Sequence, residues 1–248
     1  MNNMFYTGKS GLSAYENAVN VTAHNIANTS TTGYKSTKAN FRELVYNNMD
    51  INKNDALTEE TSVKSGHGVR IYDDSLQFTQ GELAKSDYPL DFALEGDGLF
   101  AVERDGAVQY TRDGTFDISV EAGGNYLVTS DGAYVLDANS QKIIVPDAAD
   151  GTLDTGAVKN AIGVFDFTNP YGLQRAGDQS FYQTEISGEA QPMEAGTYKL
   201  LESYTERSNV DIAKEMSDMI VLQRAYQFSS RVVQTADEME DTVNALRR

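Results

Sequence analysis

Cysteine and tryptophan are absent from the 248-residue sequence, and histidine occurs only twice, as His24 and His67. The absence of cysteine excludes disulfide bonds and thiolate metal sites. Two histidines offer little material for a multi-histidine metal centre or a histidine-based proton relay. We therefore expect no metal and no other cofactor.

Long apolar runs are also missing, since none approaches the ~20 residues that a membrane-spanning helix needs. Residues 1–10 lack the basic segment followed by an apolar segment that marks a secretory signal peptide. We therefore expect no direct insertion into a membrane. If the protein works outside the cytoplasm, another export route must carry it.

Positive charge is scarce, and the formal net charge is −17. Residues 1–40 carry +2 and residues 200–248 carry −3, which leaves −16 for residues 41–199. Phosphate binding needs clustered lysine and arginine, so we expect no nucleic-acid partner. The acidic middle is typical of a solvated surface, whereas the nearly neutral ends are free to pack together.

The C-terminal segment predicts a long helix, because residues 209–248 contain neither glycine nor proline. Its start has the form of a capping box, Ser208-x-x-Asp211, with Asn209 as a competing cap. An alternating spacing of three and four residues predicts one contact stripe along the helix. The stripe comprises Leu222, Ala225, Ser229, Val232, Ala236, Met239, Val243 and Leu246.

The N-terminal segment predicts a second helix that ends near Asn28. The same alternating spacing relates Leu12, Tyr15, Val19, Thr22 and Ile26. Two starts are open: a capping box at Ser13-x-x-Glu16, or a start near Met4 that includes Gly8 and Gly11 at some cost in helix propensity.

The middle of the chain predicts antiparallel β structure. Asp-Gly pairs occur at residues 97–98, 105–106, 113–114, 131–132 and 150–151, and such pairs between apolar runs favour hairpin turns. All four prolines, at 89, 146, 170 and 192, lie in this region and are expected to mark strand ends. Strands are predicted over residues 99–102, 107–111, 115–120, 126–129, 134–136, 142–145 and 161–167, after an alternating stretch at 69–78.

A long amphipathic helix gains too little from its own hydrogen bonds to remain folded without a partner for its stripe. We therefore predict an α+β fold in which the two terminal helices form a discontinuous coiled-coil domain around a central antiparallel β domain. The expected boundaries are 1–35 with 208–248 for the helical domain, 36–88 for an extended linker with short strands, and 89–207 for the β domain. The N-terminal helix is too short to cover the whole C-terminal stripe, so other copies must cover the rest, as in an open helical filament.

Three stretches resemble the flagellar rod and hook family of axial proteins. The first is residues 25–35, with Asn25, Ala27, Asn28, Thr31, Gly33 and Tyr34. The second is residues 91–102, continued by residues 110–116. The third is residues 206–211, with Asn209 and Val210, followed by residues 219–227.

This resemblance implies a structural subunit that polymerises through its terminal helices into the hollow drive shaft between motor and hook, in the flagellar basal body. It implies that the partners are further copies of the chain, other rod subunits, the hook protein and the flagellar type III export apparatus. Phe41 and Val45 are similar to the family's short export segment. The residues expected in the helix seam are Leu12, Tyr15, Val19, Ile26, Leu222, Ala225, Val232, Ala236, Met239, Val243 and Leu246.

Within the family, the chain is shorter than the hook protein, whose outer domains are larger. The polar insert at residues 47–64 is similar to the distal rod subunit, and the rod subunit just proximal to it is the alternative.

Enzymatic readings have little support, and we expect no catalytic site. Residues 131–139 come nearest to a calcium-binding loop but lack its pattern. The competing enzyme hypothesis is a polysaccharide hydrolase, because 37 acidic residues will place some carboxylate pair at a suitable distance. A third alternative is an adhesin on a coiled-coil stalk, although such a stalk would usually carry heptads at one end only.

Overall fold

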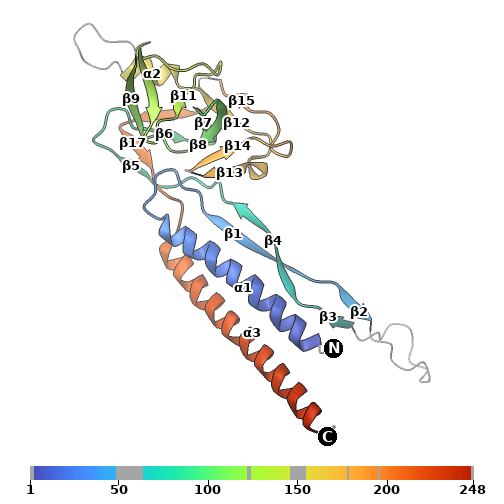
Figure 1. The fold of residues 1–248 in the computed structure, drawn as a ribbon. Coiled ribbons are helices and arrows are strands. Elements are labelled where there is room, and N and C mark those ends of the chain that lie inside the picture. Colours follow the sequence, from blue (N-terminus) through green and yellow to red (C-terminus); the bar gives the residue numbers. More distant parts are fainter. Residues whose placement is uncertain are drawn as a thin grey trace. The chain divides into compact units, whose positions relative to one another are not determined.

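The computed structural model describes residues 3–48, 64–121, 124–145, 155–177, 179–194 and 196–246. Residues 49–63 of the predicted polar insert, Pro146 and the Asp-Gly pair at 150–151 lie outside these residues. The predicted α+β class is confirmed by helices at both ends of the chain and antiparallel sheets between them (Figure 1). No helix in the described ranges is both long and apolar enough to span a bilayer.

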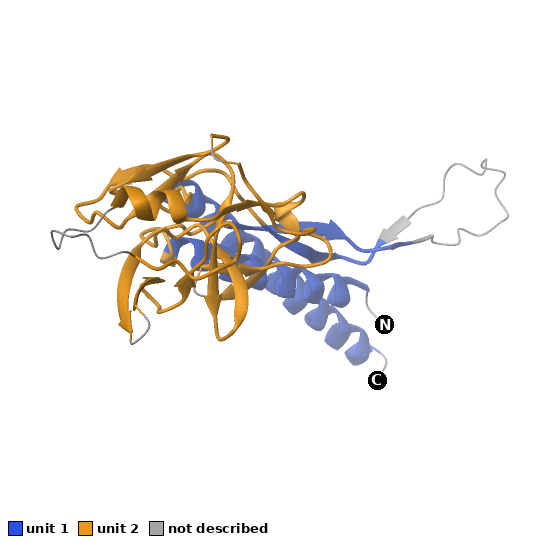
Figure 2. Ribbon diagram, turned by 90° about the horizontal axis from the view of Figure 1, so that it is seen from above, with its two compact units in different colours: residues 1–26, 37–75, 212–248 blue, residues 27–36, 76–211 orange. Residues whose placement is uncertain are grey.

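The chain divides into two compact units, each built from separate segments (Figure 2). Residues 1–26, 37–75 and 212–248 form what we call the helical unit, and residues 27–36 and 76–211 form the β unit.

The helical unit contains two long helices and two short ribbons. Helix α1 spans Asn3–Ala27 and helix α3 spans Ile212–Leu246. Strand β1 (Thr37–Glu43) pairs with β4 (Val69–Leu76), and β2 (Tyr46–Asn48) pairs with β3 (Lys64–Gly66).

Neither helix starts at its predicted capping box. Helix α1 begins at Asn3 and continues through Gly8 and Gly11, which confirms the alternative start near Met4 and makes Ser13 a helix-interior residue. Helix α3 begins at Ile212, three residues after Asn209. The prediction of a cap at Ser208 or Asn209 is therefore wrong: Ser208 Oγ accepts a hydrogen bond from Val210 N in the preceding loop, and Asn209 Nδ2 donates to the distant Gln77 O.

The β unit is organised around a nine-stranded sheet in the order β13-β14-β8-β7-β11-β10-β9, with β12 paired to β7 and β15. Two further pairs are β16 with β6 and β17 with β5, and a short helix α2 covers Thr155–Ala161. The strand bounds are β5 Leu83–Lys85, β6 Phe92–Glu95, β7 Leu99–Arg104, β8 Ala107–Thr111, β9 Phe116–Glu121, β10 Gly124–Thr129, β11 Tyr134–Val135, β12 Val164–Asp166, β13 Gln174–Gly177, β14 Ser180–Tyr182, β15 Gln191–Pro192, β16 Lys199–Glu202 and β17 Tyr204–Glu206.

Two apolar clusters fill the β unit, and strand β7 contributes to both because its side chains alternate between its two faces. Phe100 and Val102 belong to the larger cluster, where Phe100 meets Phe116 edge to face at 5.4 Å. Leu99 and Ala101 belong to the smaller one, which contains Phe165 and Phe167. The side chains that form these two clusters are therefore buried.

The Asp-Gly pairs have two different roles. Asp105 and Gly106 both have positive φ, 52° and 77°, and form the two-residue turn between β7 and β8, as predicted. The pair at 131–132 lies between the antiparallel partners β10 and β11. The pairs at 97–98 and 113–114 do not close hairpins, because the strands on either side of each pair bond to other strands. The prediction of a hairpin turn at these two pairs is therefore wrong.

Two predicted strands also change. Residues 142–145 make only isolated bridges, Leu136 to Lys142 and Tyr126 to Ile144. Of residues 161–167, only Val164–Asp166 form a strand, because helix α2 extends as far as Ala161. Pro170 starts a 3-10 turn, and Pro192 lies within the short strand β15.

Candidate functional site

Small side chains form the most buried face of α1. This face comprises Gly8, Gly11, Ala14, Ala18, Thr22 and Asn25. The predicted seam residues Leu12, Tyr15, Val19 and Ile26 are half-buried and lie one position later, beside it. The most buried face of α1 thus lies beside the predicted stripe and shares only Thr22 with it, because small side chains allow a close neighbour.

That close neighbour is α3. A Cβ atom added to Gly8 would lie 2.7 Å from Val233 Cγ2, and one added to Gly11 would lie 3.0 Å from Ser229 Oγ. At the other end of α1, Asn25 Nδ2 donates a hydrogen bond of 3.2 Å to Glu215 Oε2 on α3. These contacts make the two helices antiparallel neighbours within the helical unit (Figure 1).

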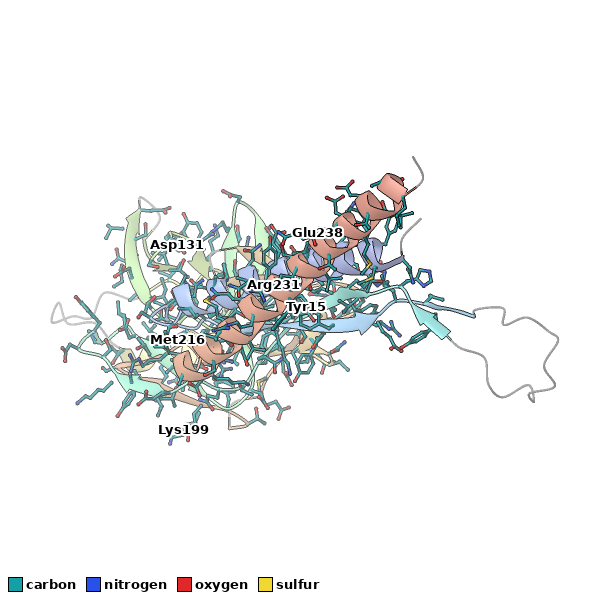
Figure 3. All side chains as sticks on the ribbon, turned by 90° about the horizontal axis from the view of Figure 1, so that it is seen from below. Tyr15, Asp131, Lys199, Met216, Arg231 and Glu238 are labelled. Carbon is teal, nitrogen blue, oxygen red and sulfur yellow. The ribbon has the colours of Figure 1, made fainter. Side chains whose placement is uncertain are left out.

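Much of α3 has exposed apolar side chains. Among the predicted seam residues, Leu222 and Ala225 are half-buried and Ala236 is buried. Val232 is 37% exposed, and the exposure rises through Met239 at 46% and Val243 at 63% to Leu246 at 83%. Met216 is also exposed, and it lies on α3 together with Arg231 and Glu238 (Figure 3).

Asn25 shows why an amide is found in the N-terminal motif. Its Oδ1 accepts a hydrogen bond from Thr37 N at 3.0 Å, and its Nδ2 donates one to Thr37 O at 2.8 Å. A single buried side chain thereby holds the first residue of β1 against α1. An aliphatic residue could not make both bonds.

The rest of the N-terminal motif forms a tight turn in the β unit. Ala27 ends α1, and Asn28 accepts hydrogen bonds from Thr31 N and Thr31 Oγ1, both at 3.2 Å. Gly33 has a φ of 67°, and a Cβ there would lie 2.5 Å from Asp113 N. Tyr34 is buried beneath the Arg175 guanidinium, 5.1 Å from its ring centre. At residue 33, only glycine can combine a positive φ with so close an approach to the backbone of residue 113.

A buried ion cluster follows directly after this turn. Glu206 on β17 bonds Lys35 Nζ at 2.7 Å and Arg112 Nε at 2.5 Å, and all three side chains are at most 5% exposed. Glu206 Oε1 also accepts a hydrogen bond from Gly81 N at 2.8 Å. Lys35 Nζ donates a further bond of 2.9 Å to Thr79 O.

Arg112 connects this cluster to the loop between β6 and β7. Its guanidinium donates hydrogen bonds to the carbonyl oxygens of Leu94, Gly96 and Gly98. With Nε bound to Glu206, the planar fork of donors is almost fully used.

The ion cluster has two cations for one carboxylate, and its pKa values reflect that imbalance. Burial acts to raise the pKa of Glu206, but Arg112 and Lys35 outweigh burial and hold the pKa below its ordinary value. Burial lowers the pKa of Lys35, and the attraction of Glu206 offsets only part of this effect. At neutral pH, Glu206 is therefore ionised.

Asn209 of the C-terminal motif joins separate segments of the β unit. Its Oδ1 accepts a hydrogen bond from Ser36 N at 2.7 Å, and its Nδ2 donates to Gln77 O at 2.7 Å and to Thr79 O at 3.1 Å. Val210 N bonds Ser208 Oγ at 3.3 Å. The side chain of Asn209 thus organises the loop before α3 and does not cap the helix.

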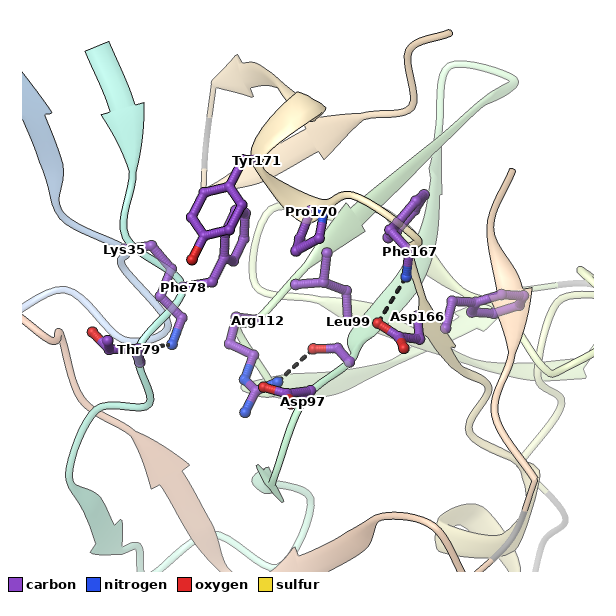
Figure 4. A pocket seen from close by; sticks show the side chains of 12 residues that line it. Lys35, Phe78, Thr79, Asp97, Leu99, Arg112, Asp166, Phe167, Pro170 and Tyr171 are labelled. Carbon is purple, nitrogen blue, oxygen red and sulfur yellow. Dashed lines mark hydrogen bonds between the residues drawn. The ribbon is translucent and has the colours of Figure 1, made fainter. Parts of the chain in front are cut away.

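A cavity of about 480 Å³ lies beside the ion cluster within the β unit (Figure 4). Lys35 and Arg112 line it, but most of their donors are bound to the groups described above. A ligand would therefore meet mainly aromatic rings and the carboxylates of Asp97 and Asp166. In the described part of the chain, no group of three or more acidic or histidine side chains is placed to hold a metal ion.

The predicted export residues lie on or beside β1. Phe41 is 43% exposed and packs its ring 5.6 Å from that of Tyr15, whereas Val45 is 81% exposed. They belong to the helical unit.

Sequence reasoning did not single out Lys35, Arg112 or Glu206, although each lies in a stretch that carries the family resemblance. Glu206 lies 171 positions from Lys35 and 94 positions from Arg112, so no local pattern in the sequence indicates that these three charges are buried together.

Three protein families match separate parts of the chain. Residues 5–35 match the family described as "Flagella basal body rod protein". Residues 93–161 match "Flagellar hook protein FlgE/F/G D1 domain", and residues 201–246 match "Flagellar basal body rod FlgEFG protein C-terminal". The three matches cover both terminal helices and much of the β unit.

Similar proteins match over almost their whole length. The flagellar basal-body rod protein FlgG of Borreliella burgdorferi is 34% identical over 98% of this chain and 98% of its own. FlgG of Agrobacterium fabrum is 37% identical over 94% and 95%. FlgG of Buchnera aphidicola subsp. Acyrthosiphon pisum is 32% identical over 97% and 98%. The chain therefore belongs to the flagellar basal-body rod and hook family, is most like the distal rod protein, and is a structural subunit of the rod in the flagellar basal body.

Proposed function

We propose that this rod subunit polymerises with copies of itself through α1 and α3, paired as an antiparallel coiled coil. In this proposal, residues 1–35 and 208–248 form the inner domain that lines the tube, 36–88 are an extended linker, and the acidic β domain of residues 89–207 faces outward. The seam is built from the residues named above, from Leu12 on α1 to Leu246 on α3.

The observation that carries the proposal is the uncovered apolar surface of α3. Met239, Val243 and Leu246 are 46%, 63% and 83% exposed. Burying a large apolar side chain is worth about 1.5–3 kcal/mol, so three such residues leave a substantial free energy unused in the single chain. A second copy, in contact through a different surface, would use it, and repeated unlike contacts generate an open helical polymer.

Antiparallel pairing explains why this surface is left over. Gly8 lies opposite Val233, and Asn25 bonds Glu215. Helix α1 therefore covers α3 only from about Glu215 to a few residues beyond Val233. At 1.5 Å per residue, the last turns of α3 extend past the start of α1 by roughly 10 Å. We propose that neighbouring copies, and at the ends of the rod other rod subunits and the hook protein, cover these turns.

We further propose that the chain is exported by the flagellar type III apparatus, with Phe41 and Val45 as the export segment. Val45 is 81% exposed, so its side chain is accessible in the folded chain as well. We infer no enzymatic role. The relatives named above are rod proteins by name, and none of those names supports the polysaccharide-hydrolase alternative.

A pair of matched substitutions tests the assembly proposal. Met239→Asp should prevent completion of the rod, because assembly would bury a charge without a partner. Gln234→Asp adds the same charge at an exposed polar position of α3 and should leave the rod intact. Electron microscopy of basal bodies from cells carrying each variant measures the effect, with circular dichroism of the purified chains to verify folding. Intact rods and normal swimming in Met239→Asp cells would contradict the proposal.

A further inference from the structure

We propose that Glu206 and Asn209 form one connected hydrogen-bond network, which we call the fastening. It joins three of the chain segments that connect the β unit to the rest of the protein. When the rod turns, it transmits force into the β unit. The fastening comprises Gly33–Ser36, residues 77–81 and residues 206–209. The proposal rests on the polymeric function proposed above and deepens it, because it assigns a mechanical role to residues inside one subunit.

The first observation concerns the four points at which the chain passes from one unit to the other. These points are residues 26–27, 36–37, 75–76 and 211–212. Three of these four connections lie within two residues of a group that takes part in the fastening: Ser36, Gln77 and Asn209. Pulling on β1, β4 or α3 therefore loads a residue of the fastening almost directly.

The second observation is that Asn209 bonds both of the other segments. Its side chain accepts from Ser36 N at 2.7 Å and donates to Gln77 O at 2.7 Å. Ser36 and Gln77 are also bonded to each other, because Gln77 N donates to Ser36 O at 2.8 Å. The three connections thus form a closed set of hydrogen bonds, and displacement of one strains the other two.

The third observation is that Glu206 joins the same segments a second time. Gly33 N donates to Glu206 O at 2.7 Å, and the carboxylate bonds Lys35 and Gly81 N. Arg112 extends the bonding to the carbonyl groups of Leu94 in β6 and of Gly96 and Gly98 in the loop that follows β6. A load that enters at Ser36, Gln77 or Asn209 is thereby spread over the body of the β unit.

Burial strengthens the bonds that Glu206 makes with Lys35 and Arg112. Lys35 is 3% exposed, Arg112 5% and Glu206 3%, so water does not compete for their donors and acceptors. Hydrogen bonds in such low-dielectric networks reinforce one another, and the loss of one weakens the remainder. A fastening of this kind differs from three independent loop contacts because it opens as one unit.

Amide hydrogen exchange on the full-length chain tests this cooperativity. The variant Asn209→Asp keeps an acceptor for Ser36 N but can no longer donate to Gln77 O and Thr79 O. We expect the amides of Gly33, Gln77 and Gly81 to exchange about tenfold faster together, although none of them bonds to the side chain of residue 209. The amides of Leu127 and Val145, which bond elsewhere in the β unit, should be unchanged.

Asn169→Asp is the matched control, because Asn169 Nδ2 also donates to a backbone carbonyl in the β unit, that of Ile186 at 3.3 Å. It should leave Gly33, Gln77 and Gly81 unaffected. The proposal is overturned if Asn209→Asp changes the Ser36 amide alone, or if Asn169→Asp accelerates the same three amides.

Swimming under load supplies the mechanical readout. Cells with Asn209→Asp should build rods of normal length, swim in dilute medium, and slow several-fold more than Asn169→Asp cells as methylcellulose is added. Identical speed curves for the two variants, or loss of rods with unchanged amide exchange, would overturn the force-carrying role. Failure of the polymerisation proposal is recognised separately, by intact rods in Met239→Asp cells.

Discussion

The two units of this protein bury opposite kinds of side chain. In the β unit, the residues removed from solvent are large: Phe92, Phe100 and Leu127 are each 0% exposed. In the helical unit, the most buried face of α1 consists mainly of glycine and alanine, while Val243 and Leu246 on α3 remain exposed. The β unit therefore has a core of large side chains, whereas the helical unit combines a close helix contact with exposed apolar side chains along α3.

This difference teaches how a subunit can be stable alone and still require assembly. Large buried side chains contribute the transfer free energy that a lone domain needs. Small residues at Gly8 and Gly11 contribute little of it, but they allow α3 to approach closely. We expect substitutions in the β unit to lower the stability of the single chain and substitutions on exposed α3 to affect the polymer only.

The largest effect is expected at Glu206. Glu206→Gln leaves Lys35 and Arg112 buried without a carboxylate, and the removal of one partner from a buried ion cluster typically costs about 3–5 kcal/mol. Urea unfolding, followed by the near-ultraviolet circular dichroism of the tyrosines, measures the change. The matched control is Glu95→Gln, which breaks the exposed pair with Lys199 and should cost less than about 1 kcal/mol.

The pH dependence of this difference provides a second check. The pKa of Glu206 lies below its ordinary value of 4.5 in the folded chain, so its contribution to stability is present above about pH 4.5 and is lost as the pH falls through the lowered pKa. The difference in unfolding free energy between the native chain and Glu206→Gln should thus be constant from pH 5 to 7 and should become smaller in acid. If Glu206→Gln and Glu95→Gln lowered the unfolding free energy equally, burial of the ion cluster would not increase its contribution to stability.

A smaller loss of stability is expected at Gly33, where the backbone of the N-terminal motif lies against the backbone of residue 113. Gly33→Ala combines a φ of 67° with a Cβ only 2.5 Å from Asp113 N, and we expect a loss of about 2–4 kcal/mol. Gly132→Ala is the control, since its φ is 81° but nothing lies within 4 Å of the added Cβ, so about 1 kcal/mol is expected. The same unfolding measurement applies. Similar losses at both positions would mean that conformation alone, and not close packing of the motif, selects glycine at residue 33.

Sequence reasoning succeeded where one local rule decides the structure. The lack of glycine and proline after residue 209 predicts a helix, and α3 is continuous over Ile212–Leu246. Residues 107–111 were predicted as a strand and form β8, and Asp105-Gly106 closes the expected turn before it. In each case, propensity and turn chemistry act over a few residues and nothing distant opposes them.

It failed where distant segments decide the structure. Lys35 and Glu206 are separated by 171 positions, and no local pattern indicates that they meet. On α1, Gly8 and Gly11 allow the close approach of α3, and hydrophobic periodicity gives such small residues the least weight. The stripe of large residues stays a prediction for the polymer seam. Asn209 was read as a helix cap because its residue type suits one, but its partners Ser36, Gln77 and Thr79 come from elsewhere in the chain.

The smallest effect on the single chain is expected at Val243, and it is the sharpest test of the comparison between the units. Val243 is 63% exposed, whereas Val135 in the β unit is 0% exposed. Val135→Ala removes buried methyl groups and should cost about 2 kcal/mol. Val243→Ala should change the unfolding free energy by no more than about 0.5 kcal/mol, since alanine favours the helix and little surface is lost. Polymer yield, measured by sedimentation, should nonetheless fall for Val243→Ala if a neighbouring copy covers this residue. A large loss of single-chain stability at Val243 would mean that the last turns of α3 already have a partner within their own subunit.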